Sequence, residues 1–270
     1  MSCATCDQLV PAERLFCPTC STPAGGSPVE PGIRTRSLRG VGVAAIVGVV
    51  AVLIAESVTR LLPLAGVALA EEAMRTGDVD LLHGAALLDL VAAVGALAVW
   101  IVAGALVIVW FWRARKNLDA FPGARRGMRA GWAIGGWFIP LANLVIPFRV
   151  GGEIARASLW RQKTPRGVSI WWLMLLVVWF GNVWDGRRVD AASEALPTVL
   201  ATRADFQQYV DYYQAMLAPG LLILIPLIGS AAALIWMIVA VGRAQEERIA
   251  RGRTGPVMPG ATVPAPPPTR

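Results

Sequence analysis

Four apolar stretches, each close to the thickness of a bilayer in length, constrain this 270-residue chain more than any other feature. A membrane-spanning helix needs about 20 mostly apolar residues, and the stretches cover residues 38–62, 87–112, 168–184 and 216–241. Hydrophobic residues make up 56% of the chain, against about 45–50% in soluble domains. The sequence therefore predicts an all-α polytopic membrane protein, with its helical membrane domain over residues 39–245.

A fifth apolar segment, "GGWFIPLANLVIPFR", is interrupted by Pro140 and Pro147, which disfavour a continuous helix, and carries the polar Asn143. If this segment crosses the bilayer, the Lys and Arg residues of the loops divide almost evenly between the two sides. If it turns back, the basic loops all lie on one side, as the positive-inside rule requires. We therefore expect four crossings plus a re-entrant or in-plane segment at about 130–148, with a true crossing as the alternative. This threading predicts a multi-pass protein of the bacterial cytoplasmic membrane with both termini cytosolic.

All the cysteines lie in the first twenty residues, as "CATC" (Cys3, Cys6) and "CPTC" (Cys17, Cys20). Two CxxC pairs joined by a short loop can place four thiolates around one tetrahedral Zn²⁺, and a site with no open position is structural. So short a segment needs the metal to fold. Residues 1–22 resemble the short zinc ribbons of many bacterial proteins, although Asp7 and Ser21 stand where those modules usually have Gly. Disulfides or a redox pair are the alternatives.

Two flanking stretches are rich in turn-forming residues. Residues 23–38, beginning "PAGGSPVEPG", predict a flexible linker. Residues 246–270, ending "PAPPPTR", predict a disordered Pro-rich tail.

The segments "FWRARKNLDAF" and "GWAIGGWFIPLANLVIPFRVGGEIARAS" resemble a bacterial membrane family known as domain of unknown function 4328. The resemblance is strongest over residues 110–172. It rests on the order and spacing of Arg115, Asn117, Trp132, Trp137, Pro140, Asn143, Pro147, Glu153 and Arg156. It implies a membrane module of unassigned activity and transfers no catalytic residue.

Polar residues in and beside the apolar stretches suggest two further sites. Arg149, Glu153 and Arg156 share one helix face, which favours a solvated helix under the membrane; the alternative is a latch in which Glu153 binds Arg115 or Arg129. Glu56 and Asp89 are the acids nearest to the hydrocarbon. Pairing of Glu56 with Arg60 at the interface is one interpretation, and a proton or cation site is the other.

Tryptophans also mark the expected boundaries of the membrane. Five tryptophans fall near the ends of predicted spans, where the indole ring favours the membrane interface: Trp110, Trp112, Trp171, Trp172 and Trp184. We therefore expect them at that interface.

The net charge of +7 comes from arginines that flank apolar segments, which is a topology signal rather than a nucleic-acid footprint. His83 is the only histidine, and no nucleophile–base pair or phosphate loop appears, so we expect no enzyme. The favoured function is a membrane adaptor or regulator whose ribbon or tail binds a cytosolic protein; the alternative is a small transporter or channel in which the re-entrant segment lines a cavity. The bilayer is the one certain partner, and homo-oligomerisation is left open.

Overall fold

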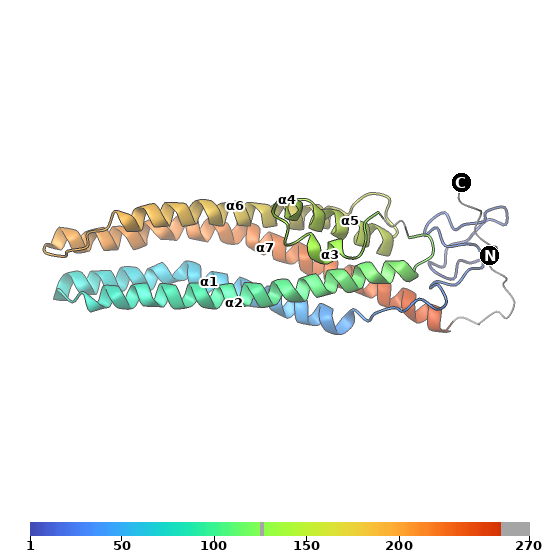
Figure 1. The fold of residues 1–270 in the computed structure, drawn as a ribbon, viewed down its shortest axis with the longest axis horizontal. Coiled ribbons are helices and arrows are strands. Elements are labelled where there is room, and N and C mark those ends of the chain that lie inside the picture. The colour runs from blue at the N-terminus through green and yellow to red at the C-terminus, as the bar shows by residue number, and fades with distance from the viewer. Residues whose placement is uncertain (125–126, 255–270) are drawn as a thin grey trace.

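The chain folds into a long helical bundle with a small helix-free module at one end (Figure 1). The computed structural model describes residues 1–124 and 127–254. Over these residues its elements are α1 (Arg39–Thr76), α2 (Asp80–Asn117), the short 3₁₀ helix η1 (Leu118–Ala120), α3 (Trp132–Gly135), α4 (Pro140–Asn143), α5 (Ile146–Ser158), α6 (Arg166–Glu194) and α7 (Arg203–Thr254).

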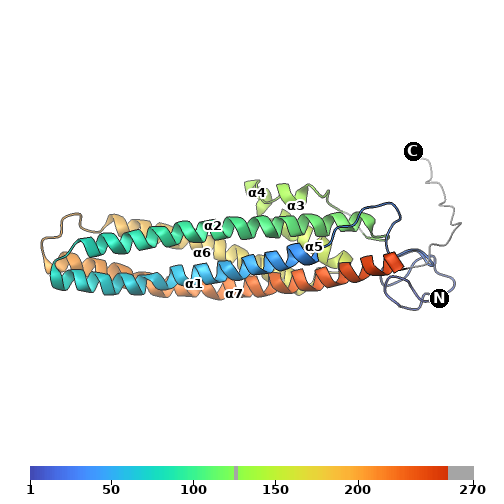
Figure 2. The ribbon, with the colours of Figure 1, turned by 90° about the horizontal axis from the view of Figure 1, so that it is seen from below.

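Two antiparallel helix pairs build the bundle. α1 packs on α2, and α6 packs on α7. The pairs join along α1 and α7, which lie side by side (Figure 2). α1 and α2 approach each other closely at Gly48, which has no side chain. A Cβ atom at this position would lie only 3.1 Å from the Cα atom of Ala103. In the part of the chain that the structure describes, the backbones of α2 and α6 do not approach each other closely, and the two helices meet through side chains such as Phe111 and Trp171. The four-helix array is therefore open on that side.

Four helices, α1, α2, α6 and α7, are long and apolar enough to cross a membrane, counting only described residues. This confirms the predicted fold class of an all-α protein with four membrane-spanning helices. The helices extend well past the predicted spans: α7 has 52 residues, about 78 Å at 1.5 Å per residue, whereas the hydrocarbon core measures about 30 Å. The stretches between the spans, expected as loops, are thus largely helical.

A second core explains this extension at the end of the bundle far from the N terminus. There α1, α2 and α7 bury small and aromatic side chains, among them Ala73, Leu82, Phe206 and Tyr213. These residues recur at helical spacing without forming a long apolar run, so a search for uninterrupted apolar stretches does not detect them.

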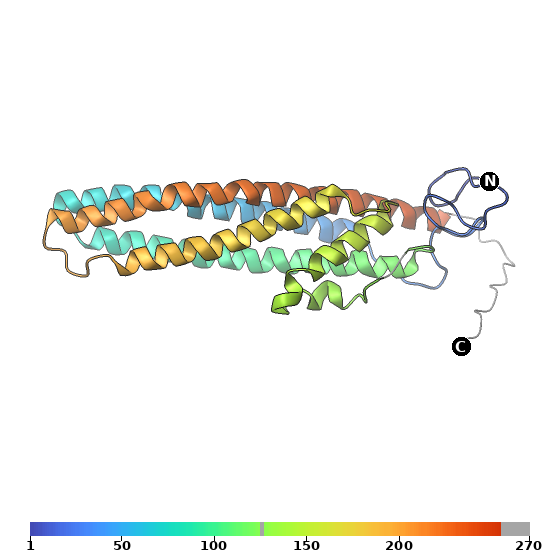
Figure 3. The same ribbon diagram turned by 90° about the horizontal axis from the view of Figure 1, so that it is seen from above.

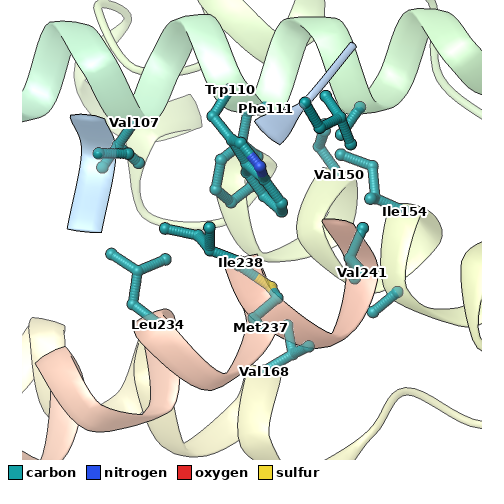
Figure 4. Packing of buried hydrophobic residues seen from close by; sticks show 14 of the residues in the cluster. Val107, Trp110, Phe111, Val150, Ile154, Val168, Leu234, Met237, Ile238 and Val241 are labelled. Atoms are coloured by element: carbon teal, nitrogen blue, oxygen red, sulfur yellow. The ribbon is translucent and has the colours of Figure 1, made fainter. Parts of the chain in front are cut away.

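The main core lies in the half of the bundle nearer the N terminus, where α5 packs between α2, α6 and α7. Figure 4 shows Trp110 and Phe111 of α2 directed towards Ile238 and Met237 of α7. The expectation of interfacial tryptophans is wrong for Trp110, Trp171 and Trp172, which are buried. They pack with Phe111 and Trp137 in one aromatic cluster, whose ring centroids lie 5.2–6.4 Å apart.

The proline-containing segment forms α3, α4 and the start of α5, each too short to span a bilayer. Pro140 and Pro147 occupy the first turns of α4 and α5, where a missing N–H costs nothing. The three helices lie against one half of the bundle only, the half nearer the N terminus (Figure 3). The two ends of this excursion lie at the same end of the bundle. Phe121 packs against Arg248 near the end of α7, and Trp160 packs against the cysteine cluster in residues 1–22.

The two flanking stretches differ from the expectation. Residues 246–254 continue α7 and are helical, because "AQEERIAR" contains no helix breaker; residues 255–270 of the expected tail lie outside the described residues. The linker is pinned rather than free: the Glu30 amide donates to the Ala120 carbonyl at 2.8 Å. The Arg36 guanidinium also stacks on Trp112, 4.5 Å from its ring centroid.

Candidate functional site

The four cysteines converge at the end of the bundle. Their sulfur atoms all lie within 4.8 Å of one another. The Sγ atoms of Cys3 and Cys20 are 3.4 Å apart, and those of Cys6 and Cys17 are 3.5 Å apart. Around one Zn²⁺ with Zn–S bonds of about 2.3 Å, tetrahedral sulfurs would be about 3.8 Å apart. The cluster is therefore suited to hold one metal ion.

Two matching turns position the thiols. In the first, the Asp7 amide donates to the Cys3 carbonyl; in the second, the Ser21 amide donates to the Cys17 carbonyl, each at 2.9 Å. Asp7 and Ser21 have φ angles of 59° and 58°, in the left-handed region that glycine adopts without strain. The turns thus form without the glycines that such modules usually have.

The thiols of Cys6 and Cys17 differ in acidity. Burial raises the pKa of the Cys6 thiol well above its ordinary value. Burial also acts upward on Cys17, but the backbone N–H groups of Cys20 and Thr19 favour its thiolate, and its pKa falls to about 7. Metal binding needs thiolates and so must displace protons from this cluster.

The cysteine module, residues 1–22, does not hang free but packs on the bundle. Arg248 of α7 is 3% exposed; it donates to the carbonyls of Pro28 and Pro122, both at 2.9 Å. Arg251, one turn along, donates to the Thr5 carbonyl and pairs with Asp7 at 3.0 Å. We call this set of contacts the module dock.

Two connections complete the module dock: the one after α5, which contains Trp160, and the one before α3, which contains Gly123. Trp160 adopts a left-handed φ of 49° and packs against the cysteine cluster. Gly123 approaches Ser21 so closely that a Cβ would lie 2.2 Å from its carbonyl oxygen. Glycine is therefore required at position 123, since both its φ of 77° and this contact exclude a side chain.

Glu153 lies at the centre of what we call the loop latch. Its carboxylate accepts hydrogen bonds from the amides of Gly127 and Met128, at 3.0 and 3.1 Å, and lies 3.3 Å from the Arg115 guanidinium. Arg115 also pairs with Asp119. The favoured interpretation of a solvated face is thus wrong for Glu153, which is 6% exposed. The two amide donors come from the loop before α3, which packs over that face, and Arg115 comes from α2.

Asn117 belongs to a second polar junction. Its side chain exchanges hydrogen bonds with the backbone of Arg36, at 2.7 and 2.8 Å, and donates to Gln245 at 2.9 Å. Gln245, fully buried, donates in turn to the Ala114 carbonyl and the Ser158 hydroxyl. This junction joins α2, α5 and α7.

The remaining residues of the sequence pattern have separate positions. Arg156 donates to the Thr164 hydroxyl rather than pairing with Glu153. Trp137 belongs to the aromatic cluster, whereas Trp132 is partly exposed. Asn143 lines a cavity between the helices. Sequence reasoning missed Gln245, the last residue of the predicted membrane domain, and Arg248 in the predicted tail, because their partners lie far away in the sequence.

An ionic cluster lies at membrane depth in the half of the bundle away from the cysteines. Arg60 donates to Glu56, to Asp185 and to the side-chain oxygen (Oδ1) of Asn182, at 3.3, 2.9 and 2.8 Å. Trp100 donates to the other Glu56 oxygen at 2.7 Å. The expected pairing of Glu56 with Arg60 is thus confirmed.

The cluster includes Arg188 but not Asp89. Arg188 pairs with Asp185 at 3.0 Å, so the cluster continues along α6. Asp89, the second acid singled out in the sequence, takes no part in the ion pairs described here.

These features define a polytopic helical membrane protein with an appended cysteine module. The model of the family described as "Domain of unknown function (DUF4328)" matches residues 74–244, and the chain belongs to this family. The resemblance read from the sequence is thereby confirmed. The match includes the loop latch and Asn117 but ends before Gln245, and it includes neither the cysteine cluster nor Glu56. No curated protein and no solved structure matches the chain.

Proposed function

We propose that this protein is a membrane adaptor or regulator whose cytosolic cysteine module folds around one structural Zn²⁺, is docked on the bundle and presents a surface to a cytosolic protein. The observation that carries the proposal is the two-sided character of the module. One side is fixed in the module dock. Elsewhere on the module Leu9, Leu15 and Phe16 are 80%, 80% and 57% exposed.

Zinc is the metal of this proposal because all four donors are sulfur and their spacing suits a tetrahedron. When bound, Zn²⁺ would supply the folding energy that 22 residues cannot obtain from a core. Four thiolates and one Zn²⁺ carry a net charge of −2, and the module dock sets Arg248 and Arg251 beside the cluster. The arginines thus complement the charge of a loaded site.

A cytosolic location for the module follows from two arguments. Zinc thiolates persist in reducing compartments. The basic loops and the module also lie together at one end of the bundle, which the positive-inside rule assigns to the cytosol. In a bacterial cytoplasmic membrane this orientation makes the excursion through α3, α4 and α5 re-entrant from the cytosolic side. The proposal assigns no reaction to the chain.

The exposed apolar side chains support the adaptor role. On α1, α2 and α6 exposed valines and leucines are expected, since lipid covers them. Leu9, Leu15 and Phe16 lie beyond the end of the bundle, where water would cover them instead. Exposed apolar side chains that gather on one surface outside the membrane mark a protein-contact site, and Leu15 and Phe16 are adjacent in the chain.

A photo-crosslinking amino acid at Leu15 tests the proposal in intact cells that express the full chain. We expect a discrete adduct with a cytosolic protein, and loss of that adduct when Cys3 and Cys6 are both replaced by Ser at equal protein level. Val199, 75% exposed at the opposite end of the bundle, is the matched control site and should not give the adduct. Protein adducts that are absent at Leu15, or unchanged without the cysteines, would refute the adaptor role.

A transporter is the second candidate, favoured by one observation. Asn143 and the backbone around it line a cavity at membrane depth, and broken helices form binding sites in transporters. Substrate uptake or current that survives deletion of residues 1–22 would favour this function over the adaptor.

A further inference from the structure

The open side of the bundle contains a cavity of about 570 Å³. It lies between α2 and α6, whose backbones do not approach each other closely in the described residues. On the side nearer the cysteine module it is closed by Asn143, Leu144 and Trp137. Trp172 fixes this floor, since its indole N–H donates to the Leu144 carbonyl at 3.0 Å. The cavity is thus closed towards one end of the bundle and open to the side, towards the lipid.

The walls of the cavity are mainly apolar and aromatic. Four tryptophans line it, Trp100, Trp137, Trp172 and Trp179, and leucine, alanine and valine side chains of α2 and α6, among them Ala93, fill the space between them. Such walls suit a hydrocarbon chain, and the volume lies within the range of roughly 300–1,000 Å³ typical of small-molecule sites.

The polar lining consists of Glu56 and Arg60 of the ionic cluster, together with Thr59, Asn182 and, at the floor, Asn143. Glu56 lies about 26 Å along α1 from Arg39, at 1.5 Å per residue, so in a hydrocarbon core of about 30 Å the cluster lies towards the far interface. Its charges balance: Glu56 and Asp185 oppose Arg60 and Arg188. A headgroup with net charge would therefore find no uncompensated partner there.

Hydrogen-bonding capacity nevertheless remains in the cavity. Among the described residues, the amide nitrogen of Asn182 has no acceptor, although its oxygen accepts from Arg60. The Thr59 hydroxyl donates to Ala55 and retains lone pairs to accept. A hydroxyl group, which both donates and accepts, complements this pair of groups.

We propose that this cavity binds a neutral lipid alcohol: one hydrocarbon chain that lies along the tryptophans and ends in an uncharged hydroxyl-bearing head beside Thr59 and Asn182. The ligand enters from the bilayer between α2 and α6. The site is independent of the adaptor role, because none of its residues belongs to the cysteine module or to the module dock.

The test uses the purified full chain in lipid nanodiscs and a monoacylglycerol whose chain carries a photoactivatable diazirine. Adducts should map to α2 and α6 peptides that line the cavity. Ala93→Trp fills the cavity from an exposed position and should lower labelling at least fivefold. Ala98→Trp, also exposed on α2 but outside the cavity, should leave it unchanged. Equal labelling of the two variants would overturn the proposal, since it would mean that lipid merely coats the surface.

Competition identifies the head. Unlabelled monoacylglycerol should displace the probe, whereas a fatty acid and a long-chain amine of equal chain length should compete at least fivefold less well. Better competition by either charged amphiphile would overturn the assignment of a neutral head. Thermal unfolding of Ala93→Trp and Ala98→Trp, expected at the same temperature, separates cavity filling from misfolding.

Discussion

At the scale of single residues, the cysteine ligands could be predicted because two CxxC pairs bring their thiols together through local chain geometry alone. Gln245 and Arg248 could not, since their partners Asn117, Pro28 and Pro122 lie more than a hundred residues away in sequence. Nothing in "GRAQEER" distinguishes a buried glutamine from a solvated one. Periodic spacing shows which residues share a helix face, but only the neighbouring elements determine whether that face is exposed to solvent.

Ser21 provides the first prediction. Its φ of 58° costs a non-glycine residue about 1 kcal/mol, so Ser21→Gly should stabilise the module and strengthen zinc retention roughly fivefold. Chelator competition with the purified protein measures this. Asp7→Gly relieves the same strain but also removes the ion pair with Arg251; its gain should be smaller. Weaker zinc retention in Ser21→Gly would contradict the assignment of strain.

Gln245→Leu is the second prediction. The change removes the acceptor of one Asn117 amide hydrogen bond and the donor to the buried Ser158 hydroxyl, which should destabilise the protein by about 2–4 kcal/mol. The thermal unfolding midpoint in detergent should fall by roughly 5–15 °C. Gln208→Leu, at an exposed position of the same helix, is the control and should change it little. A neutral effect of Gln245→Leu would mean that the junction is hydrated.

At the scale of elements, the membrane-spanning helices could be predicted but their lengths could not. An apolar run reveals only the part that lipid surrounds, whereas Ala73 and Phe206 are buried by one another. The prolines also gave correct information about their own segment, because Pro140 and Pro147 begin helices rather than interrupt one. What they could not reveal is the loop that covers Glu153.

The loop latch gives the third prediction. Glu153→Gln retains the shape of the side chain but removes the more buried of the two counter-charges of Arg115 and leaves only Asp119, which should cost about 3 kcal/mol, the lower end for a broken buried pair. Replacing both residues by Met should recover much of this loss. The exposed pair of Glu72 and Arg75 is the control, and Glu72→Gln should cost under about 1 kcal/mol. Thermal unfolding of the three variants measures the pattern; equal losses from Glu153→Gln and Glu72→Gln would exclude a buried latch.

At the scale of the whole molecule, the cysteine module, the latch and the dock all lie at one end, and the second core lies at the other. The linker and the end of α7 hold the module in place, so its fold and that of the bundle are coupled. A sequence divided into ribbon, linker, membrane domain and tail suggests four independent parts. Long-range contacts such as Arg248 with Pro28 join them into one body.

The orientation of this body in the membrane gives the last prediction. Gln162, exposed before α6, lies at the module end, and Ser193, exposed at the end of α6, lies at the other. If α3, α4 and α5 return to the side from which the chain entered, an impermeant thiol reagent added to intact cells should label Ser193→Cys but not Gln162→Cys. After permeabilisation both should react. The unsubstituted protein sets the background, since its thiols share the protected side. Labelling of Gln162→Cys in intact cells would place the basic loops and the zinc thiolates outside, and the adaptor role could not stand.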